Sequence, residues 1–287
     1  MSVLFLLILL LTAIFCIVLY YLLTRREIKH IDSPQVSFPS LSQIHQVIDT
    51  SAFFQRMNKV DLVARNATTV PGYIKLYKAA LMEFPQSQKT ALNTLTQKVD
   101  AHIEWTKKLN TIPWKFAKVA TRIEEGWPHT LGDIIFLSDE FFKMSQDQQV
   151  ITLLHEKFHV YQRLYPLETH KLIAKYWGFT VLDTLSRLPI ARNNPDINGF
   201  VYGVARIRIF QAYNSLTPSG IPDSRVVALN DQDEEVPYPM DLPSVIGQRE
   251  HPYEIMACFL PEIIIKKYGK DPSPFTSATN VWMSKFL

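Results

Sequence analysis

The sequence predicts a mostly helical α+β protein, in which an N-terminal transmembrane helix precedes a globular region with a small sheet. Three features indicate this fold class. Residues 3–23 are apolar and carry no charged side chain, as is typical of a membrane-spanning helix. Apolar residues then recur at helical spacing through most of the chain, and the pattern changes to that of strands between Trp114 and Leu137.

Composition excludes several classes of protein. Hydrophobic residues make up 47% of the chain and aromatic residues 12%, which is ample for a packed core and argues against disorder. The net charge of +3 comes without a basic run interleaved with aromatic residues, so no nucleic-acid partner is expected. The only two cysteines, Cys16 and Cys258, are far apart in sequence and form no disulfide framework.

The N-terminal run is long enough to cross a hydrocarbon core of about 30 Å as a helix. A cleavable signal peptide is the alternative, but it would need a basic residue before the run, a shorter run and small residues at a cleavage site. The sequence has none of these features, so an uncleaved anchor through residues 3–23 is favoured.

Basic residues set the expected orientation. Arg25, Arg26 and Lys29 follow the apolar run and none precedes it, which predicts a single-pass membrane protein whose C-terminal domain lies on the cytoplasmic side. A glycosylation sequon at Asn66-Ala67-Thr68 would matter only in a lumenal domain. Single sequons arise often by chance, so the charge pattern has more weight.

Four parts follow from these patterns: a transmembrane anchor over 1–24, a proline-containing linker over 25–40, a helical region over 41–112, and a final region over 113–287. The helices expected in the third part cover Leu41–Met57, a segment after Pro71, and Gln86–Leu109.

In the last part the pattern predicts a pair of strands, Trp114–Ile123 and Asp133–Leu137, before the next helix. The edge of such a strand could bind an extended peptide, or the strand could be a plain sheet member, and the sequence leaves both open. The segments expected after that helix are a helical stretch over His170–Arg187, mixed or strand structure over Gly199–Tyr213, a loop over Thr217–Pro252, and a helix from Pro252 toward Lys267 with Gly269 as its stop.

The stretch Val150–Arg163 contains the motif H-E-x-x-H as His155-Glu156-Lys157-Phe158-His159. Residues four apart lie on one face of a helix, so the two imidazoles can bind one ion while Glu156 holds a water bound to it. Ser145 and Gln148 form a plausible capping box at the start of this helix. Two structural histidines on a core helix are the alternative, but this context favours zinc ligands and a general base.

Catalytic zinc usually has three protein ligands and a water. Gln162 and Tyr165 stand where the metzincin extension would need Gly and His, which excludes that class. Glu254 is the strongest candidate, because it lies in the first turn of a helix within an apolar segment, where an unpaired carboxylate would be costly. The alternative is a solvent-exposed Glu254 without a metal, whose negative charge the N-terminal end of the helix dipole favours. The weaker ligand candidates are Glu262, Glu168 and His170.

With these motifs the sequence resembles the zincin superfamily, and within it the gluzincins, in which H-E-x-x-H is followed by a ligand Glu on a later helix. It is also similar to predicted zincin-like proteins of large DNA viruses. The resemblance covers about Asp133 to Lys267 and rests on residues 155–159 and on His251-Pro252-Tyr253-Glu254-Ile255-Met256-Ala257. It implies that residues 113–287 form a zincin-like metallopeptidase region.

The resemblance further implies a mechanism. Zinc would activate water and polarise the scissile carbonyl of a peptide or protein substrate, and Glu156 would pass a proton to the leaving amine. His251 is the first choice for a catalytic donor that stabilises the oxyanion. The other candidate donors are Tyr253, Tyr202 and Tyr213, and each of the four side chains is more often structural than catalytic. Cys258 is expected to be an inert buried thiol rather than a metal ligand.

The expected function is therefore a membrane-anchored zinc metallopeptidase. Two alternatives stay open: a membrane-tethered structural or binding protein that keeps the fold without catalysis, and a zinc hydrolase of non-peptide bonds. A degenerate member of the family would usually lack the general base, and Glu156 is present, which favours an enzyme.

Overall fold

A computed structural model of the chain describes residues 35–266 and 273–287. The described residues all belong to one compact unit, which includes both the expected helical region 41–112 and the expected region 113–287. The expected anchor over 1–24 lies outside the described residues.

The structure corrects the predicted fold class and location. No helix within residues 35–266 or 273–287 is long and apolar enough to cross a membrane, which contradicts a membrane-anchored fold and a single-pass location. The longest of these helices, α6 (Gln86–Ile103) and α7 (Gln146–Leu164), carry polar and charged residues along their length. The segment expected to span, residues 3–23, lies outside the described part. The described fold is a mixed α/β structure with two sheets, where the sequence predicted a single small sheet.

The first sheet, as far as the chain is described, has five strands in the order β1-β3-β5-β4, and β2 also pairs with β3. β3 runs parallel to β1 and β5, whereas β4 is antiparallel to β5 and forms an edge. Its strands are β1 (Val36–Ser37), β2 (Leu81–Met82), β3 (Trp114–Val119), β4 (His129–Leu131) and β5 (Ile134–Leu137).

The second sheet has four antiparallel strands within the described residues, in sequence order. They are β6 (Thr180–Thr184), β7 (Phe200–Val204), β8 (Ile207–Tyr213) and β9 (Ser224–Leu229). The remaining short helices are α2 (Leu41–Thr50), α3 (Ala52–Gln55), α4 (Lys59–Ala64), α5 (Val70–Ala79), α8 (Pro166–His170) and the π-helix Lys171–Tyr176. The C-terminal helices are α9 (Pro252–Lys266) and α10 (Pro274–Phe286).

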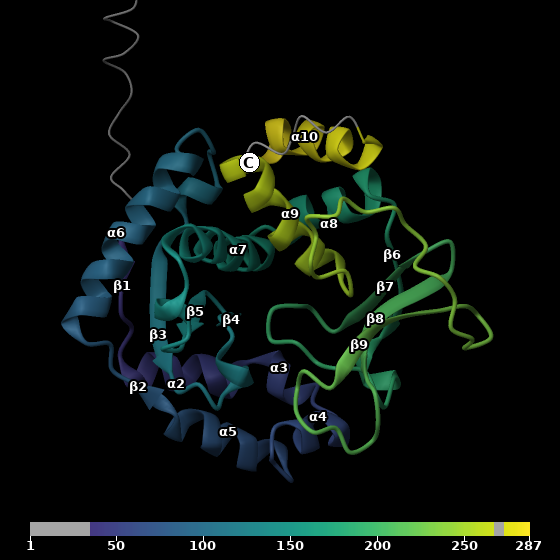
Figure 1. The fold of residues 1–287 in the computed structure, drawn as a ribbon, viewed down its shortest axis with the longest axis horizontal. Helices are drawn as coiled ribbons and strands as arrows, with labels where there is room; N and C mark the ends of the chain where they lie inside the picture. The colour runs from purple at the N-terminus through teal and green to yellow at the C-terminus, as the bar shows by residue number, and fades with distance from the viewer. Residues whose placement is uncertain (1–34, 267–272) are drawn as a thin grey trace, which may run out of the picture. The chain divides into compact units, whose positions relative to one another are not determined.

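The motif helix α7 lies at the centre of this unit, in contact with α6, α9 and strands β4 and β5 (Figure 1). It begins at the capping box that the sequence predicts, in which Ser145 Oγ accepts the Gln148 N–H and Gln148 Oε1 accepts the Ser145 N–H. Leu153, Leu154 and Phe158 are fully buried on it. Packing on several sides fixes the helix, and with it the direction of its histidines.

Several expected boundaries are wrong for local reasons. Leu41–Met57 is two helices, because Ser51 is extended and its Oγ caps α3. His170–Arg187 is helical up to Tyr176, Gly178 at φ 77° then turns the chain into β6, and a short 3-10 helix, Leu185–Arg187, ends the segment. The expected loop Thr217–Pro252 contains β9, whose residues pair with β8 along its whole length.

A buried charge network joins the N-terminal helices to the loop before β4. The Arg65 guanidinium donates to both carboxylate oxygens of Glu124 at 2.7 and 2.8 Å and to Asp61 Oδ1 at 3.2 Å. It also donates to the backbone oxygen of Asn193 at 2.9 Å. Burial raises the pKa of Glu124, but the Arg65 charge and hydrogen bonds outweigh it and lower the pKa below its ordinary value.

Arg65→Met is expected to lower the free energy of unfolding by about 3–5 kcal/mol, because it leaves two buried carboxylates without their cation. Urea unfolding would measure the change. Lys78→Met breaks a more exposed pair with Asp49 and serves as the matched control, with an expected loss below about 1 kcal/mol. Equal losses from the two variants would contradict this account of the network.

Candidate metal centre

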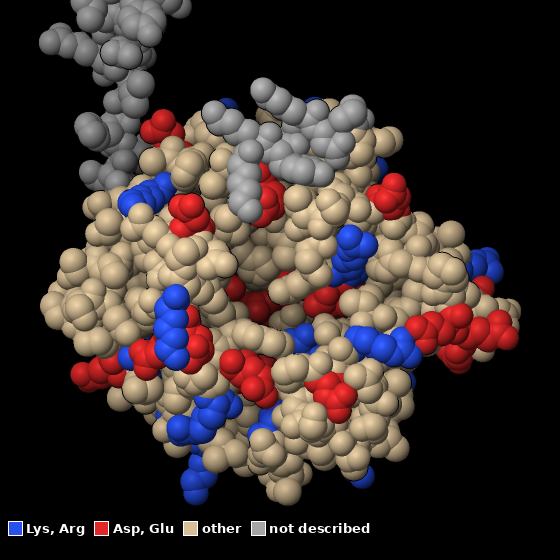
Figure 2. All heavy atoms as spheres, in the orientation of Figure 1, with Lys and Arg blue, Asp and Glu red and all other residues tan. Residues whose placement is uncertain are grey.

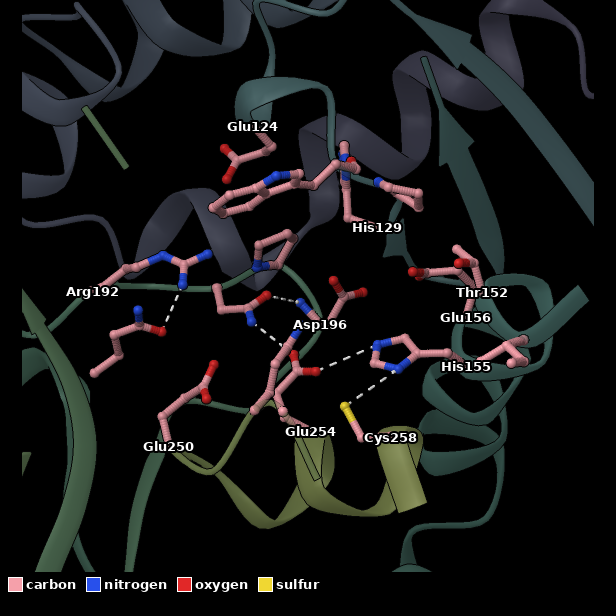
Figure 3. A pocket seen from close by; sticks show the side chains of 18 of the residues that line it. Glu124, His129, Thr152, His155, Glu156, Arg192, Asp196, Glu250, Glu254 and Cys258 are labelled. Atoms are coloured by element: carbon pink, nitrogen blue, oxygen red, sulfur yellow. Dashed lines mark hydrogen bonds and ion pairs between the residues drawn. The ribbon is translucent and has the colours of Figure 1, made fainter. Parts of the chain in front are cut away.

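The two motif histidines and Glu254 meet between α7 and α9. Figure 3 shows His155 and Glu254 facing each other. His155 Nε2 and His159 Nε2 are 3.0 Å apart, and Glu254 Oε2 lies 3.5 Å from the first and 3.4 Å from the second. All three donor atoms are within 4.8 Å of one another. The structure therefore brings together the three residues that the sequence proposes as metal ligands.

These separations fit a tetrahedral zinc site. Zinc binds imidazole nitrogen and carboxylate oxygen at about 2.0–2.2 Å, so neighbouring ligand atoms of a tetrahedron are about 3.3 Å apart. The three measured edges, 3.0, 3.4 and 3.5 Å, lie around that value. Three ligands leave the fourth position for a water or a substrate atom, as in catalytic rather than structural zinc sites.

A glutamine sets the tautomer of His159. Gln162 Nε2 donates to the backbone oxygen of Tyr253 at 2.8 Å, which directs Gln162 Oε1 toward His159 Nδ1 at 2.9 Å. The Nδ1–H of His159 then donates to that oxygen and leaves the lone pair of Nε2 for a metal. Gln162 also ties α7 to the first turn of α9, so it fixes the helix that carries Glu254.

Asn194 orients the carboxylate of Glu254, the third candidate ligand. Its Nδ2 donates to Glu254 Oε1 at 2.7 Å, and its Oδ1 accepts the backbone N–H of Asp196 at 2.9 Å. Glu254 is 1% exposed, and its Oε2 has no hydrogen-bond partner among the described residues. A buried carboxylate oxygen that faces two imidazoles and lacks a hydrogen bond is what a cation would satisfy.

Asn194→Ala is expected to weaken Zn²⁺ binding by about 10–100-fold, because it frees the carboxylate that Asn194 orients. Competition with a chromophoric chelator would measure the affinity. Asn198→Ala is the matched control, since Asn198 contacts Tyr202 and His251 and none of the three ligands. A zinc affinity that falls equally in both variants would show that Asn194 has no specific role.

Cys258 contacts the far nitrogen of His155, at 3.8 Å from Sγ to Nδ1. Because His155 Nε2 faces the other two ligands, the thiol lies on the outer side of the imidazole, where it can orient the ring. Cys258 is half-buried and borders the cavity described below.

Electrostatics at the three ligands favour a bound cation. Burial raises the pKa of Glu254, but the charge of His159 and the nearby imidazole of His155 hold that pKa well below its usual range. Burial lowers the pKa of His155, yet Cys258 and Glu254 outweigh it and raise the pKa well above its usual value. A metal ion would replace the imidazole protons, so its binding should release protons.

Glu156 is 2% exposed and points into the cavity beside His155 (Figure 3). Its Oε2 has no hydrogen-bond partner within the described part of the chain. Burial and the negative charges of Asp196 and Glu254 raise the pKa of Glu156 well above its usual value, against the opposing charges of His155 and Arg163. A carboxyl group of this kind is suited to hold and release a proton.

His155, Glu156, Glu254 and Cys258 line a cavity of about 460 Å³. It is bounded by α7, α9, the loop before β4, the segment 192–196, strands β8 and β9, and the loop 247–250. Figure 2 shows the hollow on this face of the molecule, with acidic side chains gathered in it. The acidic residues that line it are Glu124, Glu156, Asp196, Glu250 and Glu254. The volume is within the range of small-molecule sites.

The edge of β4 is already occupied near the cavity. Thr130 N–H donates to Asp196 Oδ1 at 2.7 Å, and Thr130 O accepts from Arg163 at 3.2 Å. Both outward backbone groups of this residue are thus satisfied by side chains. A peptide cannot pair with Thr130 as an added strand without displacing them, so the structure does not support strand addition at this point.

The four candidate oxyanion donors do not line the cavity. His251 Nδ1 accepts the Tyr253 N–H at 3.1 Å and Nε2 is 3.2 Å from Asn198 Oδ1, while burial lowers the pKa of His251 to about 3. Tyr202 packs on His251, and Tyr213 belongs to the Arg65 network. Because His251 does not line the cavity, its position gives the proposed catalytic role no support. Its ring instead accepts a hydrogen bond from the backbone at the start of α9.

The weaker ligand candidates also lie apart from the centre. Glu168 Oε1 pairs with Lys108 Nζ at 2.5 Å, and His170 is exposed at the end of α8. Glu262 lies two turns along α9 from Glu254 and is not among the described groups able to hold a metal.

Sequence reasoning missed the residues of the segment 192–196, Arg-Asn-Asn-Pro-Asp. Asn194 orients Glu254, Asp196 occupies the edge of β4, and Arg163 donates to Pro195 O at 2.9 Å. The one available signal is composition, because a polar run with proline next to apolar strands marks a loop and loops often carry site residues.

Comparison with protein-family models, with curated proteins and with solved structures finds no match to this chain.

Proposed function

We propose that this protein is a zinc-dependent hydrolase of peptide bonds, with His155, His159 and Glu254 as zinc ligands. The observation that supports this most strongly is the placement of the three donor atoms 3.0–3.5 Å apart, with a buried Glu156 next to them in one cavity. When bound there, zinc would supply a Lewis acid that lowers the pKa of a water and polarises a carbonyl.

Glu156 acts as the general base in this proposal. Its Oε2 accepts a proton from the attacking water and later delivers it to the leaving nitrogen. Gln162 keeps His159 in the tautomer that presents Nε2, and Asn194 keeps Glu254 Oε2 directed at the same point. Because the edge of β4 is occupied at Thr130, the cavity suits a short peptide or a peptide end better than a long extended chain.

A digest of a library of short peptides tests the proposal. The zinc-loaded protein is expected to cleave some of them, to lose that activity in 1,10-phenanthroline and to regain it when zinc is returned. Cleavage that persists unchanged in the chelator would contradict a zinc mechanism, and the absence of any cleavage by zinc-loaded protein would contradict a peptidase.

A further inference from the structure

Arg192 is a buried arginine without a carboxylate partner. It is 9% exposed and lines the same cavity as Glu156 and Glu254 (Figure 3). Its Nη1 donates to Gln211 Oε1 at 2.7 Å, and its backbone N–H donates to Gln211 O at 2.7 Å. Among the residues that the structure describes, no ion pair to Arg192 is formed and its Nε has no hydrogen-bond partner.

Two other arginines near the cavity lie close to carboxylates. Arg65 pairs with Glu124 and Asp61, and Arg163 lies 3.8 Å from Asp196. A buried guanidinium without a counter-charge is costly, since neither water nor a protein carboxylate compensates it. A ligand that brings a negative group into the cavity would remove that cost.

None of the acidic residues that line the cavity provides a counter-charge for the Arg192 guanidinium. Glu124 is neutralised by Arg65, Asp196 is held by Thr130 and Arg163, and Glu254 faces the imidazoles. Glu250 is the remaining carboxyl on this side of the cavity. Among the residues that the structure describes, Glu250 forms no ion pair with Arg192, and Glu156 lies beside His155.

The position of the guanidinium is fixed. Gln211 holds both its Nη1 and the backbone behind it, and the ring of Trp127 lies 5.4 Å from Cζ. A guanidinium that is stacked on an aromatic ring and hydrogen-bonded on one side presents its remaining N–H groups in a fixed plane. Carboxylates match that geometry with two parallel hydrogen bonds.

We propose that Arg192 binds a carboxylate of the substrate and makes the enzyme selective for peptides that place a negative group in this part of the cavity. The carboxylate is either the C-terminus of the peptide or an Asp or Glu side chain. The proposal rests on the peptidase function given above, and it specifies the substrate of that site.

Binding of matched peptides tests it in the zinc-loaded chain that carries Glu156→Gln to prevent turnover. Calorimetry compares N-acetyl-Ala-Ala-Phe as the free acid and as the amide, and N-acetyl-Ala-Glu-Ala-amide with its Gln counterpart. One charged peptide is expected to bind about 30-fold or more tighter than its neutral partner. Introducing Arg192→Gln into the Glu156→Gln chain should remove that preference and leave the affinity for the neutral peptide unchanged.

Two further variants separate this role from a structural one. Arg122→Gln makes the same chemical change at an exposed site and should keep the full preference. Arg192→Lys retains the charge and should keep part of it, with an unchanged circular-dichroism melting curve. A preference for acid over amide assigns the anion to the C-terminus, and a preference for Glu over Gln assigns it to a side chain.

The proposal is overturned if neither charged peptide binds more than threefold tighter than its partner, or if the preference survives Arg192→Gln. Equal weakening of charged and neutral peptides by Arg192→Gln also overturns it. Failure of the peptidase function has a different signature: the charge preference depends on Arg192, but the wild-type chain cleaves no peptide.

Discussion

Glu254→Gln is expected to weaken Zn²⁺ binding by more than about 100-fold, which exceeds the usual cost of losing a partner that only orients a ligand. The physical reason lies in the hydrogen bond from Asn194. With Asn194 Nδ2 still donating to the side-chain oxygen of the new glutamine, the amide NH₂ would face His155 and His159. An amide nitrogen is a poor metal ligand, and its hydrogens would repel a cation.

Glu262→Gln is the control for this prediction, because Glu262 lies on the same helix and is the alternative ligand that the sequence offered. The zinc affinity of this variant should stay within about threefold of wild type, because Glu262 is not part of the described group of side chains that could hold the ion. Competition with a chromophoric chelator measures both variants. A large loss in Glu262→Gln with none in Glu254→Gln would exchange the two assignments.

Glu156→Gln is expected to reduce kcat for peptide cleavage by about 10²–10⁴-fold while one zinc per chain is retained. The glutamine keeps the size of the side chain but cannot accept a proton from water. Since Glu156 Oε2 has no hydrogen-bond partner among the described residues, the change should disturb few contacts. Steady-state kinetics and metal analysis of the same preparation give the two readouts.

Retention of zinc distinguishes this result from simple damage to the site. Full activity in Glu156→Gln would remove the proposed base, and loss of both zinc and activity would make Glu156 part of the metal centre itself. KM should change less than kcat, because the base acts in the reaction rather than in substrate binding.

The local part of the site could be predicted from sequence because it depends on helix geometry. His155 and His159 are one turn apart on any helix, and the capping box at Ser145 fixes where that helix begins. Glu254 could be proposed because a carboxylate in an apolar helix needs a partner. The helix periodicity of α7 and α9 therefore predicted three side chains that the structure brings to one point.

The non-local part could not be predicted in this way. Asn194 and Asp196 reach Glu254 and Thr130 from an irregular segment, and contacts of that kind leave no periodic trace in the sequence. The same segment occupies the edge of β4, a short strand that lies between the two predicted strands and that the sequence pattern did not predict. β9 was missed for a related reason, since its short strand lies in a stretch dominated by prolines and acidic residues.

The direction of the His251 ring could not be predicted from its place in the sequence. His251 lies three residues before Glu254, and its ring faces Asn198 and the start of α9. Arg192 does line the cavity, but it is far from both motifs in sequence and belongs to no recognisable pattern, so the sequence did not predict its place there.

The central claim is that His155, His159 and Glu254 bind a single zinc ion. X-ray diffraction at the zinc absorption edge, from crystals of the chain equilibrated with one equivalent of zinc, tests it most directly. The account predicts one anomalous peak about 2.0–2.2 Å from each of the three donor atoms. Zinc found elsewhere, with no peak between these side chains, would contradict it.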